Sequence, residues 1–340
     1  MLANEKIKGC NRCYEQEESG FFSMRMSANK HFGHHIGLTE NPEPPMKLIY
    51  WDIRFSNLCN LRCRSCGHIF SSNWYDDQAK LAGGDWAKNN TRINFAGRSE
   101  DDIWEQLEPQ IDNLEQVYFA GGEPLIMEEH YRLLKELIKR GRTDVRLIYN
   151  TNFTQTVYKK TNVFELWREF KSVSVGASLD AMGKHAEYIR KNTVWSDVER
   201  NREQMLQICP QVDFYLSPTL SIMNALHLPE FHRDWVSKGF IKPQDLNINI
   251  LQDPLHYRID ILPHQYKVDI QELYLEHIDW LQNQDYLKRA TTGFESAINF
   301  MLADDKSNLI DKFKEKTAQL DSIRNENILD YIPELGYLYE

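Results

Sequence analysis

Apolar residues in the middle of the chain form two patterns that alternate. Short runs rich in aromatic and β-branched residues, such as residues 173–179, are typical of buried strands. Between them, apolar residues recur at helical spacing, as in residues 128–140, where Gly141 is placed to end a helix. The predicted strands are residues 48–55, 116–120, 145–149, 173–179, 212–220 and 246–251, and the predicted helices between them are residues 101–111, 128–140, 163–170, 195–209 and 229–238.

This alternation of strands and helices predicts an α/β fold of parallel strands joined by right-handed crossovers. An open doubly wound sheet and a partial barrel both fit the pattern. The flanking segments differ from the middle, because the N-terminal piece ends in a turn-rich stretch and residues 264–334 are mostly helical in pattern. The predicted domains are residues 1–45, 46–255 and 256–340, with residues 56–100 as a long polar loop inside the second.

Composition narrows the class of protein. Of the 340 residues, 41% are hydrophobic, which is enough for a substantial core. The formal net charge of −10 argues against a nucleic-acid partner bound through a basic face. No apolar run approaches membrane-spanning length, and the first residues lack the apolar core of a signal peptide. We therefore expect a cytoplasmic protein that has no membrane partner.

Five of the six cysteines stand in two tight clusters, and close clusters in a reducing compartment indicate metal sites better than disulfides. The sixth, Cys209, is predicted to be a buried structural thiol at a helix end. The clusters are Cys10 with Cys13, and Cys59 with Cys63 and Cys66.

The second cluster is the strongest chemical signal in the sequence. Cys59, Cys63 and Cys66 have the spacing C-x3-C-x2-C directly after a predicted strand. Soft thiolates select iron–sulfur clusters or zinc. Three thiolates hold three corners of a cubane cluster and leave the fourth iron open for a ligand. The alternative is a structural zinc site whose fourth ligand is a residue such as His68.

The cysteine loop resembles the cluster loop of the radical S-adenosylmethionine (radical SAM) superfamily. This resemblance implies a 4Fe-4S cluster on Cys59, Cys63 and Cys66, which are then the catalytic residues, and S-adenosylmethionine (SAM) bound to the open iron. It also implies that the fold is a partial (β/α)6 TIM-like barrel. One departure is Ser65, because many members of the superfamily carry an aromatic residue beside the adenine at that position.

Further motifs at consecutive predicted strand ends resemble the SAM-binding motifs of the same superfamily. The run Gly121-Gly122-Glu123-Pro124 resembles the motif that holds the methionine amino group. Each motif also has an ordinary explanation as a turn, a helix N-cap or a surface ion pair. The residues expected to bind SAM are Gly121, Gly122, Glu123, Pro124, Asn152, Ser178, Asp180 and Arg190, with Asp180 on the ribose and Arg190 on the methionine carboxylate.

The N-terminal cysteines resemble the closing part of a twitch domain, a shortened relative of the SPASM module that carries an auxiliary cluster in some radical SAM proteins. Two thiolates do not complete a site that needs four protein ligands. We therefore expect Cys10 and Cys13 to be a vestigial auxiliary site without a working cluster, in a chain that is either shortened relative to its relatives or has a partial ligand set.

The resemblance implies an enzyme that reductively cleaves SAM to a 5′-deoxyadenosyl radical and abstracts hydrogen from a substrate. By analogy with twitch and SPASM proteins, the expected substrate is a peptide or protein, and the expected reductant is a protein such as flavodoxin or ferredoxin. The alternatives are a radical SAM enzyme acting on a small molecule, a defective copy of such an enzyme, and a zinc-binding interaction protein without enzyme activity.

Overall fold

The computed structural model describes residues 5–18 and 23–340. The chain forms two compact units, Met1–Lys47 and Leu48–Glu340. In the described part of the first unit, two short α-helices are flanked by 3-10 turns, and neither helix buries a side chain completely. These elements are η1 (Lys8–Cys10), α1 (Asn11–Glu18), α2 (Met24–Phe32) and η2 (Gly33–Glu40).

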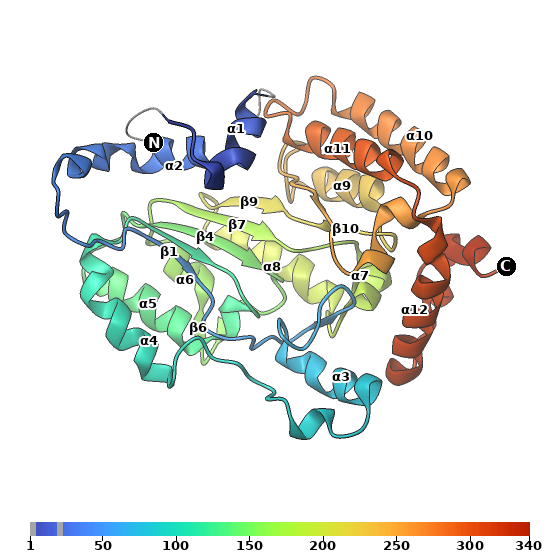
Figure 1. Cartoon of the computed structure of the whole chain (residues 1–340), viewed down its shortest axis with the longest axis horizontal. Coiled ribbons are helices and arrows are strands. Elements are labelled where there is room, and N and C mark those ends of the chain that lie inside the picture. The colour runs from blue at the N-terminus through green and yellow to red at the C-terminus, as the bar shows by residue number, and fades with distance from the viewer. Residues whose placement is uncertain (1–4, 19–22) are drawn as a thin grey trace. The chain divides into compact units, whose positions relative to one another are not determined.

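A parallel sheet of five strands, in the order β1-β3-β4-β7-β9, forms the centre of the second unit (Figure 1). The sheet continues as a short parallel ladder, in which Leu216 bridges Leu246 and β10 pairs with β11. The predicted parallel α/β fold is confirmed, and the architecture is that of a partial TIM-like barrel. The strands are β1 (Tyr50–Ile53), β3 (Gln116–Phe119), β4 (Arg146–Thr151), β7 (Val173–Ala177), β9 (Asp213–Leu216), β10 (Thr219–Leu220) and β11 (Asn249–Ile250).

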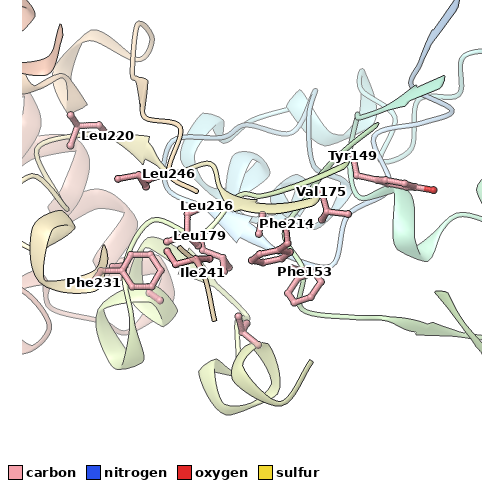
Figure 2. Packing of buried hydrophobic residues seen from close by; sticks show 14 of the residues in the cluster. Tyr149, Phe153, Val175, Leu179, Phe214, Leu216, Leu220, Phe231, Ile241 and Leu246 are labelled. Carbon is pink, nitrogen blue, oxygen red and sulfur yellow. The ribbon is translucent and has the colours of Figure 1, made fainter. Parts of the chain in front are cut away.

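The hydrophobic core lies on one face of this sheet. Alternate residues of β3 and β4 are fully buried, while the residues between them are half-buried. Figure 2 shows Val175 of β7 and Phe214 of β9 among the packed side chains, with Phe153 beside them. The ring centroids of Phe153 and Phe214 are 5.0 Å apart. The opposite face carries polar side chains, so its strand ends are free to form a polar site.

The predicted helices between the strands are present, with small shifts at their ends. The predicted helix 101–111 changes to a 3-10 turn after Leu107, where Pro109 follows and cannot donate a backbone hydrogen bond. The predicted helices correspond to α4 (Glu100–Leu107), α5 (Glu128–Lys139), α6 (Val163–Trp167), α8 (Trp195–Ile208) and α9 (Leu228–Ser237), and the structure adds α7 (Gly183–Ile189), which was not predicted.

Residues 56–100, predicted as a polar loop, contain a helix that the prediction missed, α3 (Tyr75–Ala82). Its first turn carries Asp76 and Asp77, which favour a helix N-terminus, and Gly83 follows its last residue with a φ of +65°. The helix has only eight residues, so its apolar spacing is too short to stand out in the sequence.

The C-terminal helices α10 (His264–Leu281), α11 (Arg289–Ala303) and α12 (Ile310–Arg324) belong to the same compact unit as the sheet. Buried side chains such as Phe294 and Phe313 join the same hydrophobic core. The predicted extension 256–340 therefore does not form a compact unit of its own. Among the described residues, no helix has both the length and the apolar character needed to cross a bilayer.

Candidate functional site

A cavity of about 390 Å³ lies where the carboxyl ends of the central strands meet the cysteine loop. Parallel strands point their carboxyl ends toward the same edge, so residues distant in sequence converge there. Two predicted site residues, Pro124 and Asp180, are buried behind the wall rather than on it. The predicted residues on the wall are Cys59, Cys63, Cys66, Gly121, Gly122, Glu123, Asn152, Ser178 and Arg190.

The three cysteines of the loop are free thiols on one wall of this cavity. Cys59 and Cys63 are buried, and Cys66 is half-buried. The loop is held by the short strand β2 (Arg62–Cys63), which pairs antiparallel with β8 (Arg190–Lys191). Sequence spacing and backbone pairing together therefore present all three sulfur atoms to the same space.

Burial changes the protonation of these thiols. It raises the pKa of Cys59 to about 12, and it also raises the pKa values of Cys63 and Cys66 above their ordinary value. The thiols are therefore protonated at neutral pH. A metal group binds thiolates, so its loading must release protons from this site.

The donors on the cavity wall test which metal group fits. The wall carries the thiols of Cys59, Cys63 and Cys66 and, among the described residues, no histidine. The ring of His68, the possible fourth zinc ligand, packs edge-on against Trp86, and His68 is not on the cavity wall. His68 therefore does not complete a zinc site with these thiols.

Glu123 places a carboxylate in the cavity wall and is only 1% exposed. Its Oε1 accepts hydrogen bonds from Leu125 N at 3.0 Å and Thr151 Oγ1 at 2.7 Å, and its Oε2 accepts one from Asn152 N at 2.7 Å. Burial raises the pKa of Glu123 to about 7, although these hydrogen bonds oppose the shift. The group is thus fixed in direction and titrates near neutral pH.

The two glycines before Glu123 serve the fold in a way that the sequence did not reveal. A side chain at Gly122 would place its Cβ 2.1 Å from Leu58 O, just before Cys59. Gly121 has a φ of +118°, which only glycine adopts readily. The glycines therefore let the end of β3 lie directly against the backbone that leads into the cysteine loop.

Asn152 connects the end of β4 to the same loop. Its Nδ2 donates to Asn60 Oδ1 at 2.8 Å and lies 4.0 Å from Cys59 Sγ. Thr154 closes this small network, because Asn60 Nδ2 donates to its Oγ1 at 2.8 Å. The amide of Asn152 is thus bonded to the loop, and its first role in this structure is to position Cys59.

Asp180 and Arg190, predicted to contact different parts of SAM, bind each other. Arg190 Nε and Nη2 donate to the two carboxylate oxygens of Asp180 at 2.8 and 2.9 Å. Asp180 also accepts from Thr219 N at 2.8 Å, so its carboxylate is fully engaged. The third nitrogen of Arg190, Nη1, lies 3.6 Å from Cys63 Sγ and places a positive charge beside that thiol.

Sequence reasoning missed several residues of the cavity wall. Phe70 is 66% exposed and follows the cysteine loop, in the region where Ser65 replaces an expected aromatic residue. Tyr118 alternates with core residues on its strand, so period-two patterning was the signal that could have found it. The wall residues outside the predicted set of site residues are Arg54, Leu61, Ser65, Phe70, Ser71, Tyr118, Ala120, Asn150, Thr151 and Thr219.

The other cysteine pair lies in the N-terminal unit. Cys10 ends η1 and Cys13 lies in the first turns of α1, and both are half-buried free thiols. No third cysteine occurs in residues 1–47 of the sequence. The pair therefore has too few thiols within its own unit to hold a cluster with four cysteine ligands.

No protein-family model and no curated protein matches this chain. Among solved structures, it is similar to anSMEcpe with bound S-adenosylmethionine, with 18% identity over 71% of this chain and 60% of that chain and a TM-score of 0.48. It is also similar to Streptococcus suis SuiB bound to S-adenosylmethionine, with 13% identity over 75% of this chain and 49% of that chain and a TM-score of 0.41.

A structure of SuiB bound to its precursor peptide SuiA is also similar, with 14% identity over 87% of this chain and 68% of that chain and a TM-score of 0.44. This chain thus spans about 60% of the length of anSMEcpe and about half to two thirds of SuiB. At these identities and TM-scores, the function is inferred from the residues of this chain alone.

Proposed function

We propose that this chain is a radical SAM enzyme whose cysteines Cys59, Cys63 and Cys66 hold a 4Fe-4S cluster. The observation that carries the proposal is the convergence of three free thiols on a cavity that also presents Glu123 and Arg190. When bound, the cluster supplies an electron that cleaves SAM to methionine and a 5′-deoxyadenosyl radical, which abstracts hydrogen from the substrate.

The residues of the chain would bind and orient SAM in this cavity. Glu123, held by three hydrogen bonds, is placed to accept a bond from the methionine amino group. To contact SAM directly, Arg190 and Asp180 would have to give up part of the ion pair between them. If they keep the ion pair, they act by holding the cavity wall in place. Phe70, which is exposed and lines the same cavity as Ser65, offers an aromatic face to the adenine.

The substrate and the reductant stay predictions. A peptide or protein substrate rests on the resemblance of the N-terminal segment to a twitch domain, and a small-molecule substrate is the alternative. A flavodoxin or ferredoxin as electron donor rests on the resemblance of the cysteine loop to the radical SAM superfamily. The zinc-binding interaction protein is less favoured, because His68, the possible fourth zinc ligand, is not on the wall of the cavity that the three cysteines line.

The experiment is anaerobic reconstitution with iron and sulfide, followed by assay of 5′-deoxyadenosine with SAM and dithionite. We expect the wild-type chain to form 5′-deoxyadenosine and the Cys63→Ala variant to form none, because the cluster loses one of its three ligands. Absence of product from reconstituted wild type, or equal product from the variant, would contradict the proposal. Zinc without iron after anaerobic purification would favour the interaction protein.

A further inference from the structure

A buried ion-pair network joins the cysteine loop to the C-terminal end of α12. Arg64 stands between Cys63 and Cys66, and its side chain is 0% exposed. Its Nη2 donates to Glu326 Oε2 at 2.8 Å and also to Asp321 Oδ1. These partners lie more than 250 positions further along the chain, so the loop depends on a contact that no local pattern supplies.

Both carboxylates are fixed by further contacts. Asp321 accepts from Tyr188 Oη at 3.0 Å and from Ile328 N at 2.9 Å. Glu326 accepts from Lys191 Nζ at 2.7 Å, and Lys191 belongs to β8, the strand that pairs with the cysteine loop. A charged group that already has several partners is held in one orientation, which makes it a rigid support.

A second contact reaches the loop through α3. Arg324, the last residue of α12, donates from Nε to Asp77 Oδ2 at 3.0 Å, and Arg62 Nη1 donates to Asp77 Oδ1 at 2.9 Å. Arg324 also lies over the ring of Trp74, whose Nε1 donates to Cys63 O at 2.7 Å. Figure 1 shows α3 and α12 close together, and the two helices are in contact.

The network has more positive than negative side chains. Four cations face three carboxylates, which leaves a surplus of one positive charge. Some of the nitrogen atoms, among them Arg64 Nη1, are buried without a hydrogen-bond partner in the described residues. Because the three thiols are neutral when protonated, this surplus positive charge favours a negatively charged group on the cysteines. The cations are Arg62, Arg64, Lys191 and Arg324, and the carboxylates are Asp77, Asp321 and Glu326.

We propose that the end of α12 and the turn after it form part of the metal site. They brace the segment from Cys63 to Cys66, and their ion pairs set the charge around it. Arg64, Asp321 and Glu326 are positioning residues, because they act on the cysteines through the loop. This inference rests on the proposed function, since the group that the cysteines hold is the proposed cluster.

The test compares Asp321→Asn with Asp197→Asn, the same substitution at an ion pair on the surface of α8. In the protein without metal, amide hydrogen exchange of residues 62–67 should become about tenfold faster for Asp321→Asn, because a buried charge-assisted support is lost. After reconstitution, iron release to a chelator should accelerate about as much. The midpoint potential of the cluster should rise, because one negative charge near it is removed. Asp197→Asn should match the wild type in all three measurements.

Tyr188→Phe provides a second variant that removes only the hydroxyl bond to Asp321, in case Asp321→Asn does not fold. We expect exchange and iron release to accelerate roughly threefold. Wild-type values for both variants would overturn the brace. Faster exchange with an unchanged midpoint potential in Asp321→Asn would overturn the role in setting charge. If the wild type retained no iron, the proposed function would fail, while exchange in the metal-free protein would still decide whether the brace exists.

Discussion

Both regions that carry clustered cysteines contain free thiols, but they differ in the burial of these thiols and in the structure around them. Around Cys59 and Cys63, strand ends, a β2–β8 pairing and buried ion pairs surround sulfur atoms that are themselves buried. Around Cys10 and Cys13, the short helices α1 and α2 bury no side chain completely, and both thiols are half-buried. The comparison teaches that close spacing of cysteines in the sequence supplies thiols for a metal. A metal site also needs surrounding residues that hold these thiols in place and shape the cavity between them.

The largest difference between the regions should appear in iron content. Cys63→Ala should lose nearly all iron after anaerobic reconstitution, whereas Cys13→Ala should retain the wild-type amount, because the N-terminal pair lacks further thiols within its unit. Iron and sulfide analysis with ultraviolet–visible spectra measures both. If Cys13→Ala held less iron than the wild type, the N-terminal pair would also bind metal, and the two regions would not differ in this property.

A smaller effect, on the stability of the protein, is expected from adding one methyl group in each region. Gly122→Ala should destabilise the protein by about 3 kcal/mol, because the new Cβ would lie 2.1 Å from Leu58 O and the backbone must move. Gly37→Ala in the N-terminal unit meets no atom within 4 Å and should change stability little. Thermal and urea unfolding measure both variants, and equal stability of the two would contradict the close approach of β3 to the loop.

The smallest effect concerns the charge of one carboxylate. Burial raises the pKa of Glu123 to about 7, so the group is mostly neutral below that pH and mostly charged above it. If it binds the cationic amino group of SAM, affinity should increase as pH rises through about 7. Glu123→Gln should bind SAM about tenfold more weakly at high pH and lose this dependence.

Isothermal titration across this pH range tests the prediction for Glu123. The control is Glu17→Gln in the N-terminal unit, where Glu17 pairs with Arg25 and should leave SAM binding unchanged. An equally steep pH dependence in Glu123→Gln would assign the titration to another group in the cavity.

Local patterns sufficed for most of the fold. Residues 173–179 were predicted as a strand and form one over Val173–Ala177, because the pattern of apolar side chains within a strand or helix is set by short-range spacing in the sequence. The pattern missed α3, which is short and polar. It also treated residues 256–340 as a separate extension, because the spacing of apolar residues does not show which hydrophobic core they pack into.

The sequence by itself determined the parallel α/β fold, the three thiols of the cysteine loop and the strand-end positions of Glu123 and Asn152, since all of these follow from residue type and short-range spacing. Only the tertiary structure decided that Asp180 and Arg190 bind each other. It alone brought the carboxylates of Asp321, near the end of α12, and of Glu326, after that helix, onto Arg64. The physical reason is that ion pairs between distant segments depend on how helices and strands pack against one another. The periodicity of apolar residues along the chain does not predict that packing.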